Sequence, residues 1–276
     1  MKEERLDGAG GLKIFVRSWR PDGKIRGVVA IVHGFNSHGG HYLWVAEQLA
    51  ATGLAVYALD LRGRGRSDGE RFYVEKFADY QSDVHLLVTL ARSRDPGRPL
   101  FILGHSAGGV ISCVYTLEHQ ADLSGLICES FAFQVPAPDF ALTVIKGLSY
   151  LAPRLRVLKL PNPGFSRDPK VVEALNTDPL IANEVQPAHT VAEMVRANER
   201  LRREFRLITL PVLIIHGTED KVTQPSGSQL FYDTAGSTDK TLKLYKGYFH
   251  DPLNDVGREV VMEDINAWIN ARLPVW

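Results

Sequence analysis

One short stretch combines a nucleophilic side chain with an unusual lack of bulk around it: Gly104-His105-Ser106-Ala107-Gly108. It follows the apolar run 100–103 and precedes a helical pattern, so the serine is predicted to lie on a sharp turn from strand to helix. We expect a strained backbone at Ser106, with glycines on both sides that remove colliding side chains. A hydroxyl presented in this way is typical of a serine nucleophile. A turn of small residues without chemistry, such as a phosphate loop, is the alternative that the pattern alone leaves open.

A serine nucleophile needs a histidine as base and a carboxylate that orients the histidine. Asp220 and His250 each come just past an apolar run, in the chain order acid and then histidine. This order and placement favour Ser106, Asp220 and His250 as the catalytic residues. Glu129, which follows another apolar run, is the second candidate for the acid. Among the other histidines, His216 is expected to hold its own loop.

The negative charge that develops on the carbonyl oxygen in acyl transfer needs two preorganised N–H donors. We expect these to be the backbone N–H groups of Ala107, directly after the serine, and of Phe35, in the loop after an early strand. The same loop contains His38 and His41, whose spacing could hold a metal. No third ligand is evident in the sequence, so no metal and no cofactor are predicted.

The elements that must position these residues alternate between short apolar runs and longer amphipathic segments. The runs cover residues 25–32, 54–61, 100–103, 123–128, 212–215 and 242–245. Their continuous apolar character predicts strands that are covered on both faces, as in a parallel sheet. Apolar residues at helical spacing predict helices over 42–51, 77–92 and 257–273. The alternation predicts an α/β fold with helices on both sides, and residues 12–19 are expected to form an antiparallel edge strand.

The alternation stops between residues 134 and 208. This stretch contains many prolines and two helical patterns, 140–151 and 191–205. It is too long for a plain crossover, so we predict an inserted helical cap over the C-terminal edge of the sheet, where α/β proteins bind ligands. The expected domains are therefore a core of residues 1–133 and 209–276 and a cap of residues 134–208.

The composition narrows the classes of function. Lysine plus arginine and aspartate plus glutamate both number 32, so the net charge is zero, which argues against a nucleic-acid binder. No apolar run reaches the roughly 18 residues of a membrane span, and residues 1–11 lack the apolar core of a secretory signal. The two cysteines, Cys113 and Cys128, are expected to be buried free thiols. These features favour a cytoplasmic enzyme, although a chain that had lost a signal would look the same. A monomer or a dimer is expected, and the sequence does not decide between them.

With these motifs in place, the chain resembles the α/β-hydrolase superfamily and, within it, the monoacylglycerol lipase and lysophospholipase group. The resemblance rests on residues 33–38, 60–67, 104–109, 166–169, 176–180, 216–220 and 247–250. It implies an eight-stranded, mostly parallel core with a cap over the serine. It also implies esterase activity on acylglycerols or similar esters, with Ser106, Asp220 and His250 as the triad. Two residues differ from the group: Ala107 stands where the group usually has methionine, and Ser37 where it often has glutamate. These differences bear on which acyl chain and leaving group are preferred and leave the catalytic residues unchanged.

The cap raises the question of the substrate. Residues expected to contact it along an apolar channel are His105, Phe131, Phe133, Phe140, Ile145 and Leu148. Packing of the cap on the core is the alternative role for the apolar ones. Any exposed part of this surface would contact a membrane transiently, so the enzyme would lie at the membrane periphery. Two rival functions stay open: a broad carboxylesterase for short-chain or aromatic esters, and a non-catalytic binding protein with the same shell.

Overall fold

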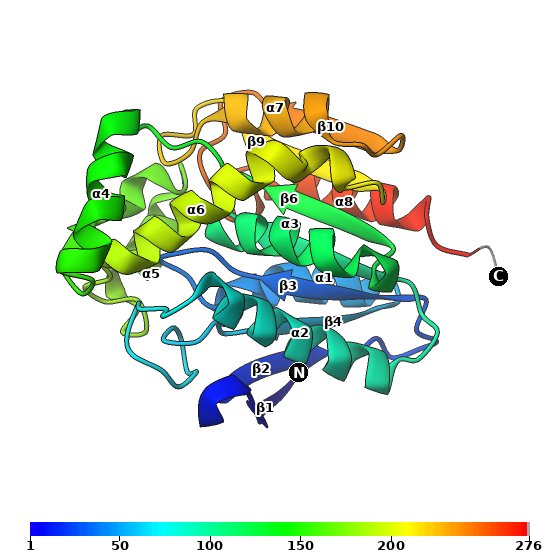
Figure 1. Ribbon diagram of the computed structural model, residues 1–276. Coiled ribbons are helices and arrows are strands. Elements are labelled where there is room, and N and C mark those ends of the chain that lie inside the picture. Colours follow the sequence, from blue (N-terminus) through cyan, green and yellow to red (C-terminus); the bar gives the residue numbers. More distant parts are fainter. Residues whose placement is uncertain (275–276) are drawn as a thin grey trace.

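Eight strands form one mostly parallel sheet at the centre of the molecule (Figure 1), in the order β1-β2-β4-β3-β5-β6-β9-β10. The computed structural model describes residues 1–274, without the side chain of Asp139. The strands are β1 (Lys2–Asp7), β2 (Lys13–Trp19), β3 (Gly27–Val32), β4 (Leu54–Leu59), β5 (Leu100–His105), β6 (Gly125–Glu129), β9 (Val212–Gly217) and β10 (Lys240–Tyr245). All neighbours from β4 to β10 pair in parallel, while β1–β2 and β2–β4 are antiparallel. The predicted α/β architecture with an eight-stranded sheet is confirmed.

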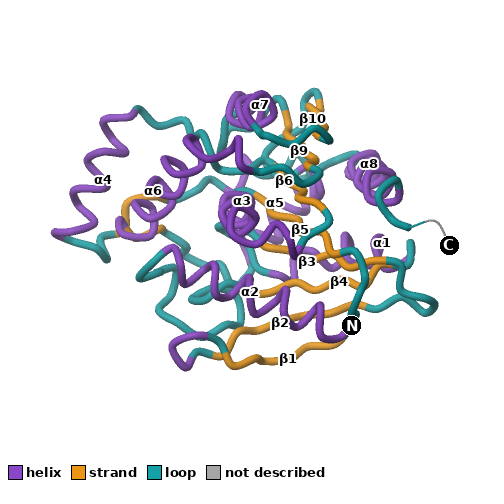
Figure 2. The backbone as a smooth tube through the Cα atoms, turned by 45° about the vertical axis from the view of Figure 1, so that its right-hand side comes forward, coloured by secondary structure: helices purple, strands orange, loops and turns teal. Residues whose placement is uncertain are grey.

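Helices cover both faces of this sheet, which explains why its central strands are apolar throughout. On one face lie α2 (Phe77–Arg94) and α3 (Ala107–His119), and on the other α1 (Leu43–Ala51) and α8 (Arg258–Asn270), with the strands between them (Figures 1 and 2). In β3, Val28 packs into the core on the α2 and α3 side, whereas Val29 packs into the core on the α1 and α8 side. A strand buried on both faces cannot show the alternation of a half-exposed one.

The antiparallel strand predicted at residues 12–19 is confirmed as β2, but it does not lie at the edge of the sheet. The edge is β1, which pairs with β2 from Lys2 opposite Ser18 to Asp7 opposite Lys13. Its sequence, KEERLD, alternates between exposed and half-buried positions and contributes only one apolar side chain. Backbone pairing and not apolar burial therefore places β1, and a search for apolar runs misses it.

The segment between β6 and β9 contains three helices and a small pair of strands. These are α4 (Asp139–Leu151), β7 (Arg156–Leu158), α5 (Pro169–Thr177), β8 (Gln186–Pro187) and α6 (Ala188–Glu204). In Figure 1, α4 and α5 lie at the end of the sheet where β5 passes into α3, and α6 reaches from there across α3. The helices predicted at 140–151 and 191–205 are confirmed to within a few residues. Neither α5 nor α7 (Pro225–Thr234), which follows β9, was predicted.

Three further features complete the fold. Short 3-10 turns cover residues 9–11, 39–42, 120–122, 162–164, 205–207 and 252–254. Within residues 1–274, no helix has both the length and the apolar character that crossing a bilayer requires. Cys113 and Cys128 are buried free thiols, as predicted, and their sulfur atoms lie 3.4 Å apart.

Candidate active site

Ser106 occupies the sharp turn that the sequence predicts. It has a φ of 54° and a ψ of −120° between the last residue of β5 and the first of α3, a strained conformation for a residue with a side chain. A Cβ on Gly104 would lie 2.4 Å from the carbonyl oxygen of Gly108, and a Cβ on Gly108 would lie 2.1 Å from the carbonyl oxygen of Val32 in β3. The two glycines therefore let the turn close on itself and pack against the neighbouring strand.

The structure brings Ser106, His250 and Asp220 into one hydrogen-bonded chain. His250 Nε2 lies 2.9 Å from Ser106 Oγ, and His250 Nδ1 lies 2.8 Å from Asp220 Oδ2. Because the carboxylate can only accept, Nδ1 carries the proton and Nε2 accepts from the serine hydroxyl. Ser106 and His250 are buried, as is the carboxylate of Asp220. This arrangement can remove a proton from the serine and stabilise the charge that then forms on the imidazole.

Several groups besides His250 hold the Asp220 carboxylate in place. Its Oδ1 accepts hydrogen bonds from the backbone N–H groups of Val222 and Thr223, at 2.7 and 2.9 Å. Its Oδ2 also accepts from His216 Nε2 at 2.9 Å and from the Thr223 hydroxyl at 2.7 Å. Burial favours the neutral acid, but electrostatic attraction to the His250 imidazole and the hydrogen bonds from the two imidazoles outweigh it and hold the pKa of Asp220 well below its ordinary value. His216 thus holds the loop, as expected, through Asp220 itself.

The two predicted N–H donors flank the serine. Ala107 is the first residue of α3, where backbone N–H groups have no partner within the helix and the helix dipole favours negative charge. Phe35 reaches the same place because a Cβ on Gly34 would lie 2.8 Å from Ser106 Cβ, an approach that only glycine allows. Phe35, Ser106 and Ala107 all line one cavity. Both predicted donor residues therefore lie next to Ser106 at the cavity.

Glu129, the second candidate for the acid, does not contact the Nδ1 atom of His250. It lies fully buried at the end of β6, and its Oε1 accepts a hydrogen bond of 2.9 Å from the backbone N–H of Leu253. Its other oxygen, Oε2, and Asp251 Oδ1 have no hydrogen-bond partner among the described residues. Burial and, next, the negative charge of Asp251 raise the pKa of Glu129 well above its ordinary value. Glu129 therefore supports the loop that carries His250 through the backbone N–H of Leu253.

We expect Glu129→Gln to stabilise the protein at alkaline pH, because the amide imitates the protonated acid. With a folded-state pKa above the unfolded value of 4.5, the stability that Glu129 contributes is complete below pH 4.5 and is lost as pH rises toward the folded pKa. Urea unfolding should show the variant gaining about 1–3 kcal/mol at pH 8. The gain should be clearly smaller at pH 5, and an equal gain at both pH values would contradict the assignment.

His38 and His41 have a third partner that the sequence did not reveal. Both Nε2 atoms lie close to Asp178 Oδ2, at 2.9 and 2.8 Å, and Asp178 belongs to the 134–208 segment. The backbone N–H of Gly40 donates to His38 Nδ1 at 3.0 Å, so the proton of that imidazole is on Nε2. An imidazole that binds a metal through Nε2 carries its proton on Nδ1 and donates it to an acceptor. In His38 the Nδ1 atom accepts a hydrogen bond instead, which is the opposite arrangement. The cluster therefore serves as a hydrogen-bonded link between the Phe35 loop and the segment that carries Asp178.

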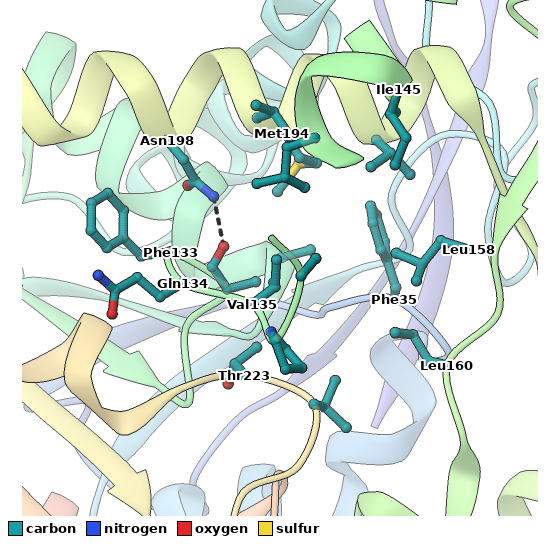
Figure 3. A pocket seen from close by; sticks show the side chains of 18 of the residues that line it. Phe35, Phe133, Gln134, Val135, Ile145, Leu158, Leu160, Met194, Asn198 and Thr223 are labelled. Atoms are coloured by element: carbon teal, nitrogen blue, oxygen red, sulfur yellow. Dashed lines mark hydrogen bonds between the residues drawn. The ribbon is translucent and has the colours of Figure 1, made fainter. Parts of the chain in front are cut away.

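A cavity of about 690 Å³ opens onto Ser106, a size typical of small-molecule sites. Figure 3 shows side chains of Phe35 and Phe133 facing it from the core side and Ile145 and Met194 from α4 and α6. The hydrogen bond from Asn198 Nδ2 to the carbonyl oxygen of Ala132 (2.8 Å) fixes α6 over the cavity. Its apolar lining includes Leu142, Leu158, Leu160, Val191, Met194 and Val222.

Four of the predicted substrate residues do not lie in the lining of this cavity, whereas Phe133 and Ile145 do. Phe131 is fully buried beneath it, packed edge-on against Phe205. His105 is buried behind the serine, where its Nε2 donates to the carbonyl oxygen of His250 (3.2 Å) and burial lowers its pKa to about 4. Phe140 points to solvent and Leu148 packs at half-exposure, because α4 turns its other face toward α6. The α6 wall was missed, although its apolar residues Val191, Met194 and Val195 recur at helical spacing.

Several known proteins are similar to this chain over nearly its whole length. The family model described as Serine aminopeptidase, S33, matches residues 23–257. The monoacylglycerol lipase of Mycolicibacterium smegmatis is 34% identical over 98% of both chains, and the monoglyceride lipase of Homo sapiens is 32% identical over 97% of this chain and 90% of its own. The crystal structure of the monoacylglycerol lipase of Paleococcus ferrophilus has a TM-score of 0.85 at 27% identity, covering 94% of this chain and 99% of that one.

These matches span nearly the whole chain, so they include the 134–208 segment as well as the core. The structural match agrees with the mostly parallel sheet flanked by helices. The chain belongs to the Serine aminopeptidase, S33, family of α/β-hydrolases and, within it, to the monoacylglycerol lipase-like group of carboxylic ester hydrolases.

Proposed function

We propose that the protein cleaves monoacylglycerol or lysophospholipid-type lipid esters through an acyl-enzyme formed on Ser106. The observation that carries this proposal is the continuous chain Ser106–His250–Asp220 at the floor of a large apolar cavity. A serine, an imidazole and a carboxylate in this order are what nucleophilic acyl transfer requires. The size and apolar lining of the cavity favour a long acyl chain, because its burial is driven by the hydrophobic effect.

The geometry supports a two-step reaction. His250 Nε2 takes the hydroxyl proton of Ser106, whose oxygen attacks the ester carbonyl, while the N–H groups of Phe35 and Ala107 hold the oxyanion. His250 then donates this proton to the leaving alcohol, which departs and leaves the acyl-serine. A water molecule gives a proton to His250 as it attacks the acyl-serine, and the fatty acid leaves as Ser106 regains its proton. Each donor to the oxyanion is worth roughly 3 kcal/mol of barrier.

We assign the cap role to residues 134–208. Leu142, Ile145, Leu158, Leu160 and Met194 from this segment face Ser106 across the cavity. An acyl chain bound there would lie between the cap and the core, with its ester next to the serine. The headgroup would then lie toward the Phe35 loop or the open mouth of the cavity.

A hydrolysis panel on the purified protein tests the proposed substrate class. It should contain monoacylglycerols of increasing chain length, a lysophosphatidylcholine, p-nitrophenyl butyrate and an aminoacyl p-nitroanilide. We expect the highest kcat/KM for a long-chain lipid ester. A maximum for p-nitrophenyl butyrate would favour the broad carboxylesterase, and hydrolysis of the anilide alone would favour a peptidase. Absence of any turnover, with no labelling of Ser106 by a fluorophosphonate, would favour the non-catalytic binding protein.

One face of α4 supports a transient contact with a lipid surface. Phe140, Val144, Tyr150 and Leu151 are exposed and recur at helical spacing along this helix. Burial of exposed side chains of this size in an apolar layer gains about 1.5–3 kcal/mol each. The cavity lining on the opposite side of α4, including Ile145, would then receive substrate directly from the lipid.

We expect Phe140→Glu combined with Leu151→Glu to lower the rate on monoacylglycerol in phospholipid vesicles by about tenfold. The rate on a water-soluble ester should stay within twofold, because neither side chain lines the cavity. Val260→Glu is the matched control, since this exposed apolar residue lies on α8 behind the sheet. Equal losses on the vesicle and soluble substrates, or an equal vesicle effect of the control, would contradict lipid contact through α4.

A further inference from the structure

A buried carboxylate in the 134–208 segment contacts the loop that presents Phe35. Glu184 lies between α5 and β8, and its side chain and that of Arg64 are each 1% exposed. Its Oε1 accepts hydrogen bonds from the backbone N–H of Asn36 (2.9 Å), from Gln186 Nε2 (2.6 Å) and from Arg64 Nη1. Gln186 also accepts from Arg64 Nη2 at 2.7 Å. One oxygen of Glu184 therefore joins the segment to two loops of the core.

Stability alone does not account for this ion pair. Taking a carboxylate and a guanidinium out of water costs more than their attraction returns in many proteins, and apolar replacements are often equally stable. Glu184 Oε2 and Arg64 Nε are buried without a hydrogen-bond partner among the described residues, which adds to that cost. The pair therefore needs another explanation. Glu184 also binds the backbone N–H of Asn36, which belongs to the peptide group that follows Phe35.

The Phe35 peptide is fixed from both sides. On the core side, His33 Nδ1 donates to the carbonyl oxygen of Gly34 at 2.7 Å, and its Nε2 accepts from the backbone N–H of Leu61 at 2.9 Å. On the other side, Asn36 has a φ of 51°, a left-handed conformation that needs external support in a residue with a side chain. Glu184 supplies that support at its N–H, and the Arg64 guanidinium lies 4.2 Å from the ring centroid of Phe35.

We propose that Glu184 is a positioning residue, which orients the Phe35 N–H toward the oxyanion through its hydrogen bond with Asn36. This inference rests on the proposed function, because it assigns Phe35 as an oxyanion donor. It means that the site is incomplete without residues 184–186 of the inserted segment, even though the nucleophile, base and acid lie outside it. The positioning role depends on the oxygen of Glu184 that accepts from the Asn36 N–H and not on the charge of the ion pair.

Two variants separate the acceptor from the charge. Glu184→Asp keeps the charge opposite Arg64 but withdraws the acceptor from Asn36 by one methylene group. Glu184→Gln with Arg64→Met removes both charges together but keeps a carbonyl oxygen at the same reach. The positioning role predicts that the first variant is impaired and the second is largely active. A structural role of the ion pair predicts the reverse.

The readouts are kcat and KM for ester hydrolysis, the rate at which a fluorophosphonate labels Ser106, and the thermal unfolding midpoint. For Glu184→Asp we expect kcat and the labelling rate to fall together by about 10- to 100-fold, since one misplaced donor forfeits part of its effect. KM should change little, and the variant should stay folded with a lowered unfolding midpoint, since buried donors lose their acceptor. For the double variant, kcat should stay within about fivefold of the parent, even if the midpoint shifts.

Arg62→Met with Asp83→Asn is the matched control. This pair is also buried: Arg62 lies in the same loop as Arg64, and its Nη2 is 2.7 Å from Oδ1 of Asp83 in α2. The side-chain hydrogen bonds and ion pairs of Arg62 and Asp83 do not reach the Phe35 loop. We expect a shifted midpoint with kcat unchanged. A folded Glu184→Asp variant with the parent's kcat and labelling rate would overturn the inference, as would a folded but inactive double variant. Failure of the parent to label or turn over would instead refute the proposed function.

Discussion

Replacement of Ser106 by alanine is expected to lower kcat/KM for ester hydrolysis by at least about 10⁴-fold. The Ser106 hydroxyl is the group on the sharp turn that forms the acyl intermediate. It is also the group from which His250 Nε2, 2.9 Å away, takes a proton. The two N–H donors and the cavity would stay in place and bind the ester without cleaving it. Initial rates on the best substrate of the panel, at equal protein concentration, measure the loss.

Loss of folding must be separated from loss of the nucleophile in this experiment. Alanine fits the turn without new contacts, and the thermal midpoint of the variant should equal that of the parent within a few degrees. Ser112→Ala is the matched control, because this buried hydroxyl in α3 has no hydrogen-bond partner among the described residues. The control should retain its rate and its fluorophosphonate labelling. Hydrolysis by a folded Ser106→Ala protein at more than a hundredth of the parent's rate would exclude Ser106 as the nucleophile.

The central sheet and the chain Ser106–His250–Asp220 could be predicted because their signals are local. Each central strand is an apolar run that ends at a glycine or polar residue, and parallel strands bring those ends to one edge. The three residues each lie just past such an end. The glycines at 104 and 108 report the shape of the turn itself, so spacing along the chain was enough to find the serine.

The cavity walls depended on contacts that no local pattern contains. The orientation of α4 is set by its packing against α6, so the sequence could not tell that Ile145 faces the cavity while Phe140 faces solvent. The partner of His38 is Asp178, which is 140 residues away, and the partner of Asn36 is Glu184, which is 148 residues away. In the sequence, both acids look like ordinary surface charges. β1 was missed for a related reason, because only backbone pairing with β2 identifies it.

The other large effect is expected from Asp220→Asn, which should lower kcat by about 10⁴-fold while the loop keeps its shape. The backbone N–H groups of Val222 and Thr223 donate to Oδ1 at 2.7 and 2.9 Å and cannot reverse their roles. They hold the amide oxygen on their side, so the new NH₂ group must face His250. An NH₂ group donates, so His250 Nδ1 must become the acceptor and its proton moves to Nε2. The imidazole can then no longer accept the proton of Ser106.

His216→Leu is the control for this prediction, because it removes one hydrogen bond from Asp220 Oδ2 but leaves the contact with His250 intact. We expect it to lower kcat by less than about tenfold, since it alters the support of the acid and not the tautomer of the base. If Asp220→Asn retained more than a tenth of the parent's kcat, the acid would have to be sought elsewhere. Glu129 would be the first candidate, and a loss of activity only when Glu129→Gln is added to Asp220→Asn would assign the role to it.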